Sequence, residues 1–597
     1  MPGISPLQDS IGVVNVSVDL NGQRLPASVE LISVEVRRAA NKVPSACLVF
    51  TDGDMASASF PLSDAADFKP GAQLTINAGY GQQEKVIFEG IVVRQGLRVS
   101  GDNDARLVVE CRDAAVRMTV GRRNANHIDK TDSDIISTLI EAHGLVADVE
   151  ATGVAHGELV QHFCSDWDFM LARAEAQGLL VIATDGSVAV KAPKAEGEPV
   201  LTVTYGVDLI SFDGDVDARY QYRSATAVSW DPRTQAALEG CAAGPASLSA
   251  QGDLDSATLS GVIGLTTLRM QGGAPQSEAM LNQWAKAQQT KSGLARVRGQ
   301  LRFQGSAEAK VGELIEIKGV GRRFSGNAFI TGLRHQIQEG AWATEADFGL
   351  APDWFCSQAD VQAPPAGALV PPVAGLQIGV VMRLDGDPAG EHRILVKLPV
   401  LQAQTEGVWA RLMQDHASSG FGSFFVPEVG DEVVLGYFAA DPSHPVVLGS
   451  LYSSRRTPPY DLAARNDIKA LVTRCKHKLE FDEKDKVITL TTPGGNRVVL
   501  SDKDKSILLE DENGNTVMLS PAGISLDSLK DISLTAKGSI TLDAVNSISL
   551  TATADVIASG LNVRCEAQIG FTGKGDATAE LSAAGQTVVK GALVMIN

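Results

Sequence analysis

Histidine, cysteine and carboxylate side chains are the first candidates for catalysis or metal binding in this sequence. The nine histidines form no H-x-x-x-H or H-E-x-x-H spacing, and the loosely paired His156 and His162 are expected to be ordinary loop histidines. The seven cysteines lie far apart without a C-x-x-C pair, so neither a zinc site nor a disulfide framework is indicated. We assign no catalytic residue, no metal site and no cofactor, and leave open only structural ions inside the C-terminal segment.

Motifs for nucleotide binding or hydrolysis are also missing from the sequence. Gly420-x-Gly422 is not followed by the strand and helix that a dinucleotide motif needs, and there is no P-loop. A lysozyme-type domain needs paired carboxylates on a fold of roughly a hundred or more residues. The segment between Tyr452 and the repeats that begin soon after residue 480 leaves no room for one. We therefore predict that the protein is not an enzyme.

Charge and hydropathy limit the partners and the location. A formal net charge of −19 over 597 residues argues against nucleic acid or an anionic membrane surface as the main partner, because both would repel the chain. The first residues show no secretory signal, and no run of 18 apolar residues occurs, so we expect neither a signal peptide nor a transmembrane helix. Such a chain is expected to be made in a cytosol and to leave it only through a machine or lysis.

The apolar pattern predicts a mainly β protein with a few short helices. Thr131-x-x-Asp134 and Ser165-x-x-Asp168 are capping boxes that predict two helices, and a further helix is expected near 277–289. Trp167 and Phe169 lie on the second of these helices and are expected to be buried, although Trp167 could instead contact another subunit. The predicted segments are a β domain (1–125), a helix and hairpin insertion (126–195), a second β domain (196–352), a proline-rich linker (353–375), a compact β unit (376–460) and a repetitive segment (461–597).

The repetitive segment has a period of eight residues. Alternation at period two within each repeat predicts a strand with one buried face. Looser versions of the pattern begin earlier, at Ile488 and Leu490, with glycine-containing turns between them. The predicted core residues of the regular stretch are Ile524, Leu526, Ile532, Leu534, Ile540, Leu542, Ile548, Leu550 and Val556.

Three architectures explain this period. A single-chain β-solenoid normally needs polar caps, whereas the chain ends in the apolar run 593–596. An antiparallel meander would need a tight turn such as Asn-Gly at each corner, and corners such as 537–539 and 545–547 supply only one glycine. The pattern therefore favours three intertwined chains, with strands stacked into a rod about 80 Å long.

The β unit at 376–459 carries an ordered set of motifs: Gly379-Val380-Val381, Arg393 to Pro399, Trp409 to Leu412, Gly420-Phe421-Gly422, Pro427 to Val433 and Asp441 to Gly449. It resembles the OB-fold domain of VgrG proteins and phage baseplate spikes, with Ala439-Ala440 as a departure where a glycine-containing turn is expected. The segments 165–169, 310–317 and 324–329 resemble the hub of the same families, and the ending 590–597 is similar to spikes of extracellular contractile injection systems.

This resemblance implies a fold of two hub β-barrels with short helices, an OB-fold and a C-terminal triple-stranded β-helix in a homotrimer. It also implies a function: the trimeric central spike of a contractile phage-tail-like injection system, which links the baseplate hub and the inner tube to a needle. Its implied partners are baseplate proteins, the inner tube protein and a PAAR-repeat tip protein. The tip protein is expected to dock on Val594, Met595, Ile596 and Asn597.

Alternative functions remain open at this point. They are a type VI secretion VgrG tip protein, a spike with hydrolase activity, and a trimeric adhesin or tail fibre. The spike would be assembled in the bacterial cytoplasm and would act at the envelope or in a released particle, touching the target membrane only by mechanical puncture. An OB-fold can also bind single-stranded nucleic acid, but residues 376–456 hold six Lys and Arg against nine Asp and Glu, which disfavours that role. The aromatic residues of this unit are expected in its core: Trp409, Phe424, Phe425 and Tyr437.

Overall fold

The computed structural model describes residues 3–8, 12–101, 104–194, 196–246, 248, 250–399 and 406–596. The chain divides into two compact units, Met1–Leu451 and Tyr452–Asn597, and each is described by itself. Strands dominate the regular structure, so the predicted mainly β fold class is confirmed.

The first strands of the N-terminal unit form because apolar and polar residues alternate along them. In β4 the side chains of Ala46, Leu48 and Phe50 are buried in one core, whereas their neighbours are more exposed. The same core takes Leu74 and Ile76 from β5. The strands of this group are β1 (Val14–Leu20), β2 (Gln23–Arg24), β3 (Leu31–Ala39), β4 (Ser45–Thr51), β5 (Gln73–Tyr80), β6 (Gln83–Val99) and β7 (Ala105–Arg112).

A second group of strands builds a second core around Leu301, Phe303 and Ile330. The two groups share one 13-stranded sheet, because β20 pairs antiparallel with β3 from Gly332↔Ala39 to Gln338↔Ser33. Strand β14 lies at one end of this sheet and β2 at the other. The strands of the second group are β13 (Leu201–Thr204), β14 (Leu209–Val216), β18 (Val297–Gln304), β19 (Leu314–Lys318), β20 (Gly326–Gln338) and β21 (Ala341–Phe348).

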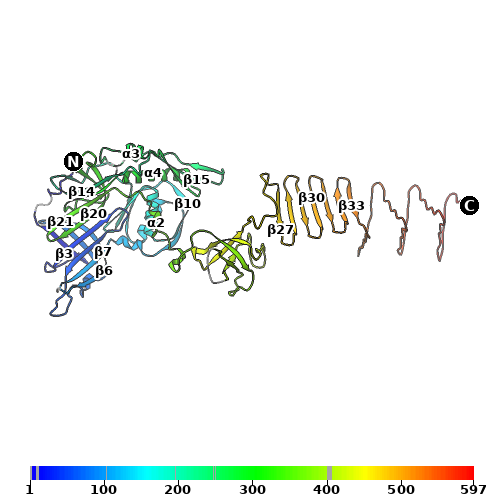
Figure 1. Cartoon of the computed structure of the whole chain (residues 1–597), viewed down its shortest axis with the longest axis horizontal. Helices are drawn as coiled ribbons and strands as arrows, with labels where there is room; N and C mark the ends of the chain where they lie inside the picture. The colour runs from blue at the N-terminus through cyan, green and yellow to red at the C-terminus, as the bar shows by residue number, and fades with distance from the viewer. Residues whose placement is uncertain are drawn as a thin grey trace. The chain divides into compact units, whose positions relative to one another are not determined.

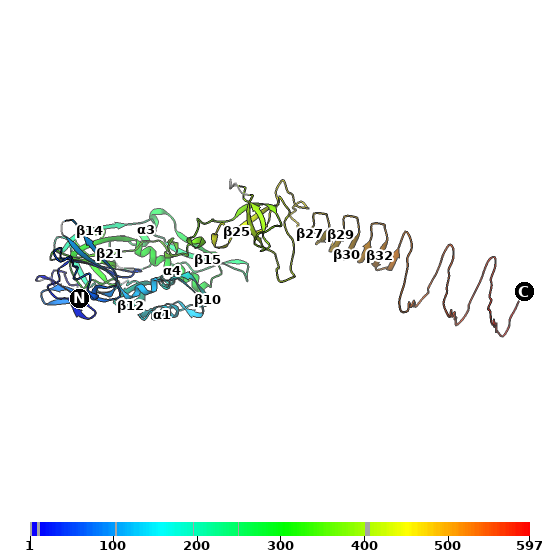
Figure 2. The same cartoon turned by 90° about the horizontal axis from the view of Figure 1, so that it is seen from below.

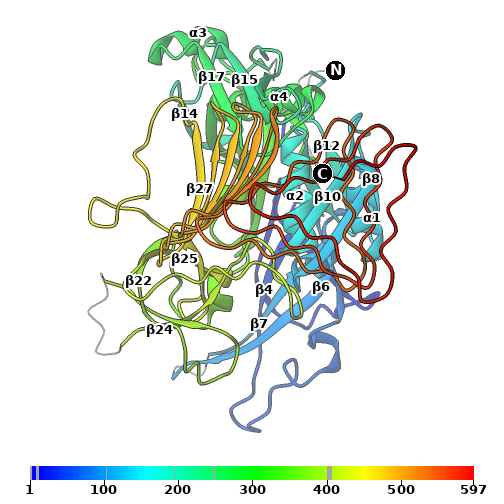
Figure 3. The same ribbon diagram turned by 90° about the vertical axis from the view of Figure 1, so that its right-hand side faces the viewer.

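Between these groups lie the predicted helices. Helix α1 (Asp132–Ala142) begins at the capping box formed by Thr131 and Asp134, and α2 (Asp166–Ala176) begins at Ser165. Figure 3 shows both helices beside the two-stranded antiparallel sheet of β8 (Arg123–Thr131) and β10 (Ala155–Cys164). The predicted hairpin that follows α2 is also present. Its strands β11 (Leu180–Thr184) and β12 (Ser187–Lys191) form a sheet with β9 (Val146–Val149).

The helix predicted near 277–289 is α4 (Glu278–Ala295), which lies beside β15 in Figures 1 and 2. The sequence interpretation missed α3 (Ser256–Ile263), which Asp255 caps by accepting a hydrogen bond from the Thr258 backbone (2.7 Å). A small sheet accompanies these helices: β15 (Ser224–Asp231), β16 (Ala236–Glu239) and β17 (Thr267–Gly272).

Five strands of residues 377–450 close into a barrel, with parallel pairing of β24 and β26 and antiparallel pairing elsewhere. Its core is dry and aliphatic, with Val381, Val396 and Leu435 fully buried. Asp387 orders the turn between the first two strands, because both of its carboxylate oxygens accept hydrogen bonds from the Arg393 guanidinium. These hydrogen bonds hold the pKa of Asp387 well below its ordinary value. The strands are β22 (Gln377–Arg383), β23 (Ile394–Lys397), β24 (Val408–Leu412), β25 (Glu432–Tyr437) and β26 (Pro445–Ser450).

The C-terminal unit begins as a ladder of five-residue strands, seen as successive rungs in Figure 1. Each strand pairs antiparallel with the next, so residues 468–527 form the meander that the sequence interpretation had set aside. Its corners turn with residues in the left-handed region, including Gly495, Gly514, Lys486 and Lys505, rather than with Asn-Gly at every corner. The strands are β27 (Ile468–Val472), β28 (Lys478–Asp482), β29 (Val487–Thr491), β30 (Arg497–Ser501), β31 (Ser506–Glu510), β32 (Thr516–Ser520) and β33 (Gly523–Asp527).

Pairing within the chain stops at Asp527. In the described residues 528–596 no strand is formed, and Figure 1 draws this segment without arrows. The structure therefore differs from a uniform β-helix over 461–597: an antiparallel meander comes first, and the regular repeats follow without partners from the same chain.

Candidate functional site

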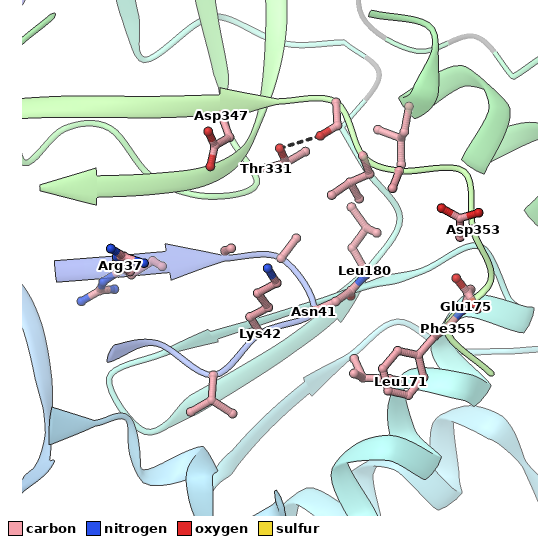
Figure 4. Close-up of a pocket in the computed structure, with 18 of the residues that line it drawn as sticks. Arg37, Asn41, Lys42, Leu171, Glu175, Leu180, Thr331, Asp347, Asp353 and Phe355 are labelled. Atoms are coloured by element: carbon pink, nitrogen blue, oxygen red, sulfur yellow. Dashed lines mark hydrogen bonds between the residues drawn. The ribbon is translucent and has the colours of Figure 1, made fainter. Parts of the chain in front are cut away.

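A cavity of about 1190 Å³ lies in the N-terminal unit, between the turn after β3, helix α2 and the ends of β20 and β21 (Figure 4). Burial and the neighbouring Glu345 raise the pKa of Asp347 in its wall, while Lys42 opposes that rise. Thr331 donates to the Gly349 carbonyl (2.9 Å), and Glu175 accepts from the Phe355 backbone (2.8 Å). Among the described lining residues, no hydroxyl or thiol is hydrogen-bonded to a histidine or carboxylate. These two hydrogen bonds tie β20 to the end of β21 and α2 to the segment at Phe355.

The two aromatic residues predicted on the second helix lie in a core of their own. Trp167 and Phe169 are 5% and 8% exposed, and they pack with Ile136, Met170 and other apolar residues of α1 and α2. Phe169 also stacks on His127 with ring centroids 5.6 Å apart. Their contacts are therefore those of a helix anchor within one chain.

Helices α1 and α2 are joined by a buried polar network. Asp132, fully buried, accepts hydrogen bonds from Arg173 (2.7 and 2.9 Å) and Gln177 (2.5 Å). Burial alone would raise the pKa of Asp132, but the hydrogen bonds and charge of Arg173, together with His156, outweigh it and lower the pKa. This network fixes the positions of the helices and leaves its carboxylate fully engaged.

The prediction of loop histidines at 156 and 162 is wrong, because both residues lie in strand β10. His156 is buried, with its Nε2 atom 3.1 Å from Asp132. Its role is structural, since its neighbours are Asp132 and Arg173 (3.4 Å), the two residues that join α1 and α2. Within the described residues, no group of three or more His, Cys, Asp and Glu is placed to hold a metal ion.

The C-terminal meander presents one continuous apolar face. Its register places Leu490 opposite Val498 and Val517 opposite Leu526, with all side chains of these columns on the same side. We call this side the apolar face. In the single chain it is largely uncovered: Leu509, for example, is 43% exposed. Its residues are Leu471, Leu479, Phe481, Ile488, Leu490, Val498, Leu500, Ile507, Leu509, Val517, Leu519, Ile524 and Leu526.

The opposite side of the meander is mixed in character and carries ion pairs. Arg497 binds Glu510 across β30 and β31 (2.6 Å), and the Lys478 ammonium lies 3.0 Å from Glu480 within β28. The residue next to Leu509 on this side is Leu508, which pairs with Val499. A sheet with one mixed, ion-paired side and one continuous apolar face is expected to bury the apolar face against a partner.

The predicted repeat residues fall on both sides of the end of the meander. Ile524 and Leu526 lie in β33, at the end of the apolar face. The others lie in the segment without strands, where all of them are exposed: Ile532, Leu534, Ile540, Leu542, Ile548, Leu550 and Val556. Their role as an interior shared by three chains stays a prediction.

The residues predicted to dock a tip protein are exposed in the described part of the chain. Val594, Met595 and Ile596 are 47%, 76% and 91% exposed, and Asn597 lies outside the described residues. Docking at this end stays a prediction as well.

The prediction that four aromatic residues fill the core of the β-barrel is wrong for three of them. Tyr437 packs against the core, whereas Trp409 lies outside it, half-buried beneath the Arg383 guanidinium (5.1 Å). Phe424 and Phe425 are 87% and 64% exposed, because they lie on the connection between β24 and β25 and not on a strand. Aromatic content alone could not distinguish a core strand from an exposed loop here.

Three family models match the chain in the order in which these parts occur. Residues 377–452 match the type VI secretion system/phage-baseplate injector OB domain, and residues 487–594 match the phage baseplate V C-terminal trimerisation domain. The barrel, the apolar face and these matches define a VgrG-like spike protein of the contractile injection class. Residues 10–339, more than half of the chain, match a further model, and the protein belongs to that family, described as the Alg8 N-terminal domain.

Curated relatives match over short stretches. The type VI secretion system spike protein VgrG1a of Pseudomonas aeruginosa is 33% identical over 61 residues, which is 10% of either chain. The actin cross-linking toxin VgrG1 of Vibrio cholerae is 27% identical over 158 residues, covering 25% of this chain and 14% of that one. The chain thus spans only about a tenth of the length of the first of these relatives.

Solved structures align over longer stretches at low identity. The Escherichia coli type VI secretion protein c3393 aligns with 73% of this chain and 99% of its own, at 13% identity and a TM-score of 0.37. The Francisella PdpA–VgrG complex aligns with 83% of this chain and 80% of its own, at 8% identity and a TM-score of 0.36.

Among the described residues, none of the helices combines the length and apolar character needed to cross a bilayer.

Proposed function

We propose that three copies of this chain form the central spike of a contractile, phage-tail-like injection system. The observation that carries this proposal is the uncovered apolar face of β27–β33, which overlaps the matched trimerisation domain at 487–594. Three such faces turned toward a common axis would cover one another, as an exposed apolar sheet requires.

The regular repeats support the same assembly. Residues 528–556 carry an apolar side chain at each predicted core position of the repeat, and no strand forms in the described residues 528–596. Backbone N–H and C=O groups in a dry interior must be paired, and two further copies would supply those partners. An intertwined rod has almost no free strand edge, so it resists unravelling under axial load.

In this proposal the N-terminal unit is the hub within the baseplate, seated on the inner tube. Sheath contraction supplies the work, the rod transmits it, and the target membrane is breached mechanically. A PAAR-repeat tip protein would cover the apolar end at 594–597, since exposed apolar strand ends invite aggregation. The spike would be assembled in the bacterial cytoplasm and would act in a released particle or at the cell envelope.

The proposed action needs no catalytic site. Thr331 and Glu175 of the hub cavity and Arg173 of the α1–α2 network are engaged in structural contacts, which supports a mechanical role. Peptidoglycan hydrolysis by the purified chain would contradict this part of the proposal, provided that controls for contaminating enzymes do not account for the activity.

Light scattering of the purified chain tests the assembly. A trimer has about 190 kDa, three times the chain mass of 62.8 kDa. A stable species of one chain mass would refute the spike proposal.

A further inference from the structure

The connection between β24 and β25 is a rigid arm that carries exposed aromatic side chains. Residues 413–426, which we call the aromatic hairpin, expose Phe421 (66%), Phe424 (87%) and Phe425 (64%). Three neighbouring phenylalanines in water are costly for a soluble protein unless a partner covers them. At many interfaces, such preorganised aromatic anchors carry most of the binding energy.

The hairpin is held in one shape by its own hydrogen bonds. The Gln414 side-chain amide donates to the Phe425 carbonyl (3.1 Å) and accepts from the Phe425 backbone (3.3 Å), as a neighbouring strand would. The Ser423 backbone donates to the His416 carbonyl (2.8 Å), and the His416 ring packs edge-on against Phe421 (5.6 Å). An arm ordered in advance loses little entropy on binding.

Both ends of the hairpin are fixed to the barrel. The Met413 backbone donates to the Val447 carbonyl of β26 (3.0 Å), and Val426 packs against the barrel core. Gly422 is required inside the hairpin, because a Cβ there would lie 2.5 Å from the His416 carbonyl at φ +141°. The phenylalanines are thus held at the end of an arm whose position on the barrel is set.

The same barrel has a second apolar surface. On β22, Val381 points into the core while Ile378 and Met382, 42% and 41% exposed, point outward. Ile378 lies opposite Val434 of β25, and Leu448 of β26 packs over Gly436, where a Cβ would lie 3.3 Å from its Cδ1 atom. We call this outer surface of β22, β25 and β26 the barrel face.

We propose that the aromatic hairpin of one copy docks on the barrel face of the next copy around the three-fold axis. A cyclic trimer is held by heterologous contacts, in which two different surfaces of each subunit meet. The aromatic hairpin and the barrel face are two such surfaces, one on a loop that leaves the barrel and one on the outside of its strands. The matched trimerisation domain begins at residue 487, so three barrels are tethered together and even a weak contact between them is populated.

This inference rests on the proposed trimer and adds an interface that the C-terminal rod does not contain. Single-stranded nucleic acid, which aromatic residues on an OB barrel can bind, fits less well, because acidic residues outnumber basic ones in 376–456. A second copy of the chain carries the apolar surface that phenylalanine rings need.

A photo-cross-linking experiment on the full chain tests the contact. A benzoylphenylalanine residue would replace Phe424, and as a control it would replace the exposed Glu391 on the turn between β22 and β23. We expect light-dependent links between subunits from position 424, mapping near Ile378, Val434 or Leu448 of another copy, and no such links from position 391. Ile378→Asp should remove the link while the trimer mass is unchanged.

The outcomes separate the two proposals. If the chain is trimeric and position 424 links only within its own chain, to another part of a neighbouring copy, or to a different protein of the particle, the docking contact is refuted alone. If the chain is monomeric, the spike proposal fails and the contact fails with it.

Discussion

Replacing Leu509 by aspartate perturbs the apolar face at the middle of the meander. Leu509 lies on the apolar face of β31, and its neighbour Leu508 lies on the opposite side. Leu508→Asp is therefore a matched control that adds the same charge to the same strand. The two variants place the carboxylate on opposite sides of the sheet, at a half-buried position for Leu508 and at an exposed one for Leu509.

The expected cost follows from burial at the three-fold axis. Leu509 is 43% exposed in the single chain, and fully burying a leucine is worth about 1.5–3 kcal/mol, so each chain would lose about 1 kcal/mol of apolar burial. An unpaired carboxylate in a dry interior costs several kcal/mol more. Three copies bring the total to the order of 10 kcal/mol per trimer, comparable with the stability of a whole domain.

Size-exclusion chromatography with light scattering, followed by electrophoresis of unheated samples in SDS, measures the result. Leu509→Asp should abolish the stable trimer at neutral pH, and Leu508→Asp should retain it. Burial raises the pKa of a carboxyl, so acidic pH should neutralise the new side chain and restore part of the trimer. Equal behaviour of the two variants would refute the assignment of the apolar face as the inner one.

Three further predictions concern other parts of the chain. Ile540→Asp would place three carboxylates inside the rod, each costing several kcal/mol, and should remove SDS-resistant trimers. Burial lowers the pKa of His335, whose ring bonds Thr344 (2.9 Å), to about 3. Since the unfolded chain takes up that proton near pH 6.5, the free energy of unfolding should fall below pH 6.5, by about 1.4 kcal/mol per pH unit, until about pH 3. Arg173→Met leaves the Asp132 carboxylate buried without its main partner and should destabilise the N-terminal unit by about 3–5 kcal/mol, measured by urea unfolding.

Matched controls sharpen these three tests. Thr541→Asp, one position from Ile540, should leave trimers intact. His335→Gln should weaken the fall in the free energy of unfolding below pH 6.5. An unchanged slope of that free energy with pH would show that other groups cause the fall. Arg219→Met, at a side chain that is 69% exposed, should cost less than about 1 kcal/mol. An equal loss for Arg173→Met and Arg219→Met would contradict the buried network.

Local signals in the sequence predicted much of the fold. The capping residues at Thr131 and Ser165 gave the starts of α1 and α2, and the motifs of 376–459 gave the barrel. Helix α3 was missed because its eight residues show little amphipathic pattern beyond the cap at Asp255. Helix starts depend on neighbours in sequence, which is why they are predictable.

The features that were mispredicted depend on pairing at a distance. The apolar alternation of 468–527 is the same for an antiparallel meander and an intertwined helix, and only the register between strands distinguishes them. Phe424 and Phe425 were placed in a core because their side chains are apolar, although their loop lies outside the barrel. His156 could be assigned only once β10 was seen to pass beside Asp132.

Hydrogen exchange of residues 528–556 in the purified full chain tests the central claim most directly. In these residues the structure shows no strand pairing within one chain, so a lone chain would exchange these amides within seconds to minutes. Three intertwined chains would pair them, and the account predicts protection equal to that of β29–β32. Rapid exchange of 528–556 beside a protected β29–β32 ladder would contradict an intertwined spike.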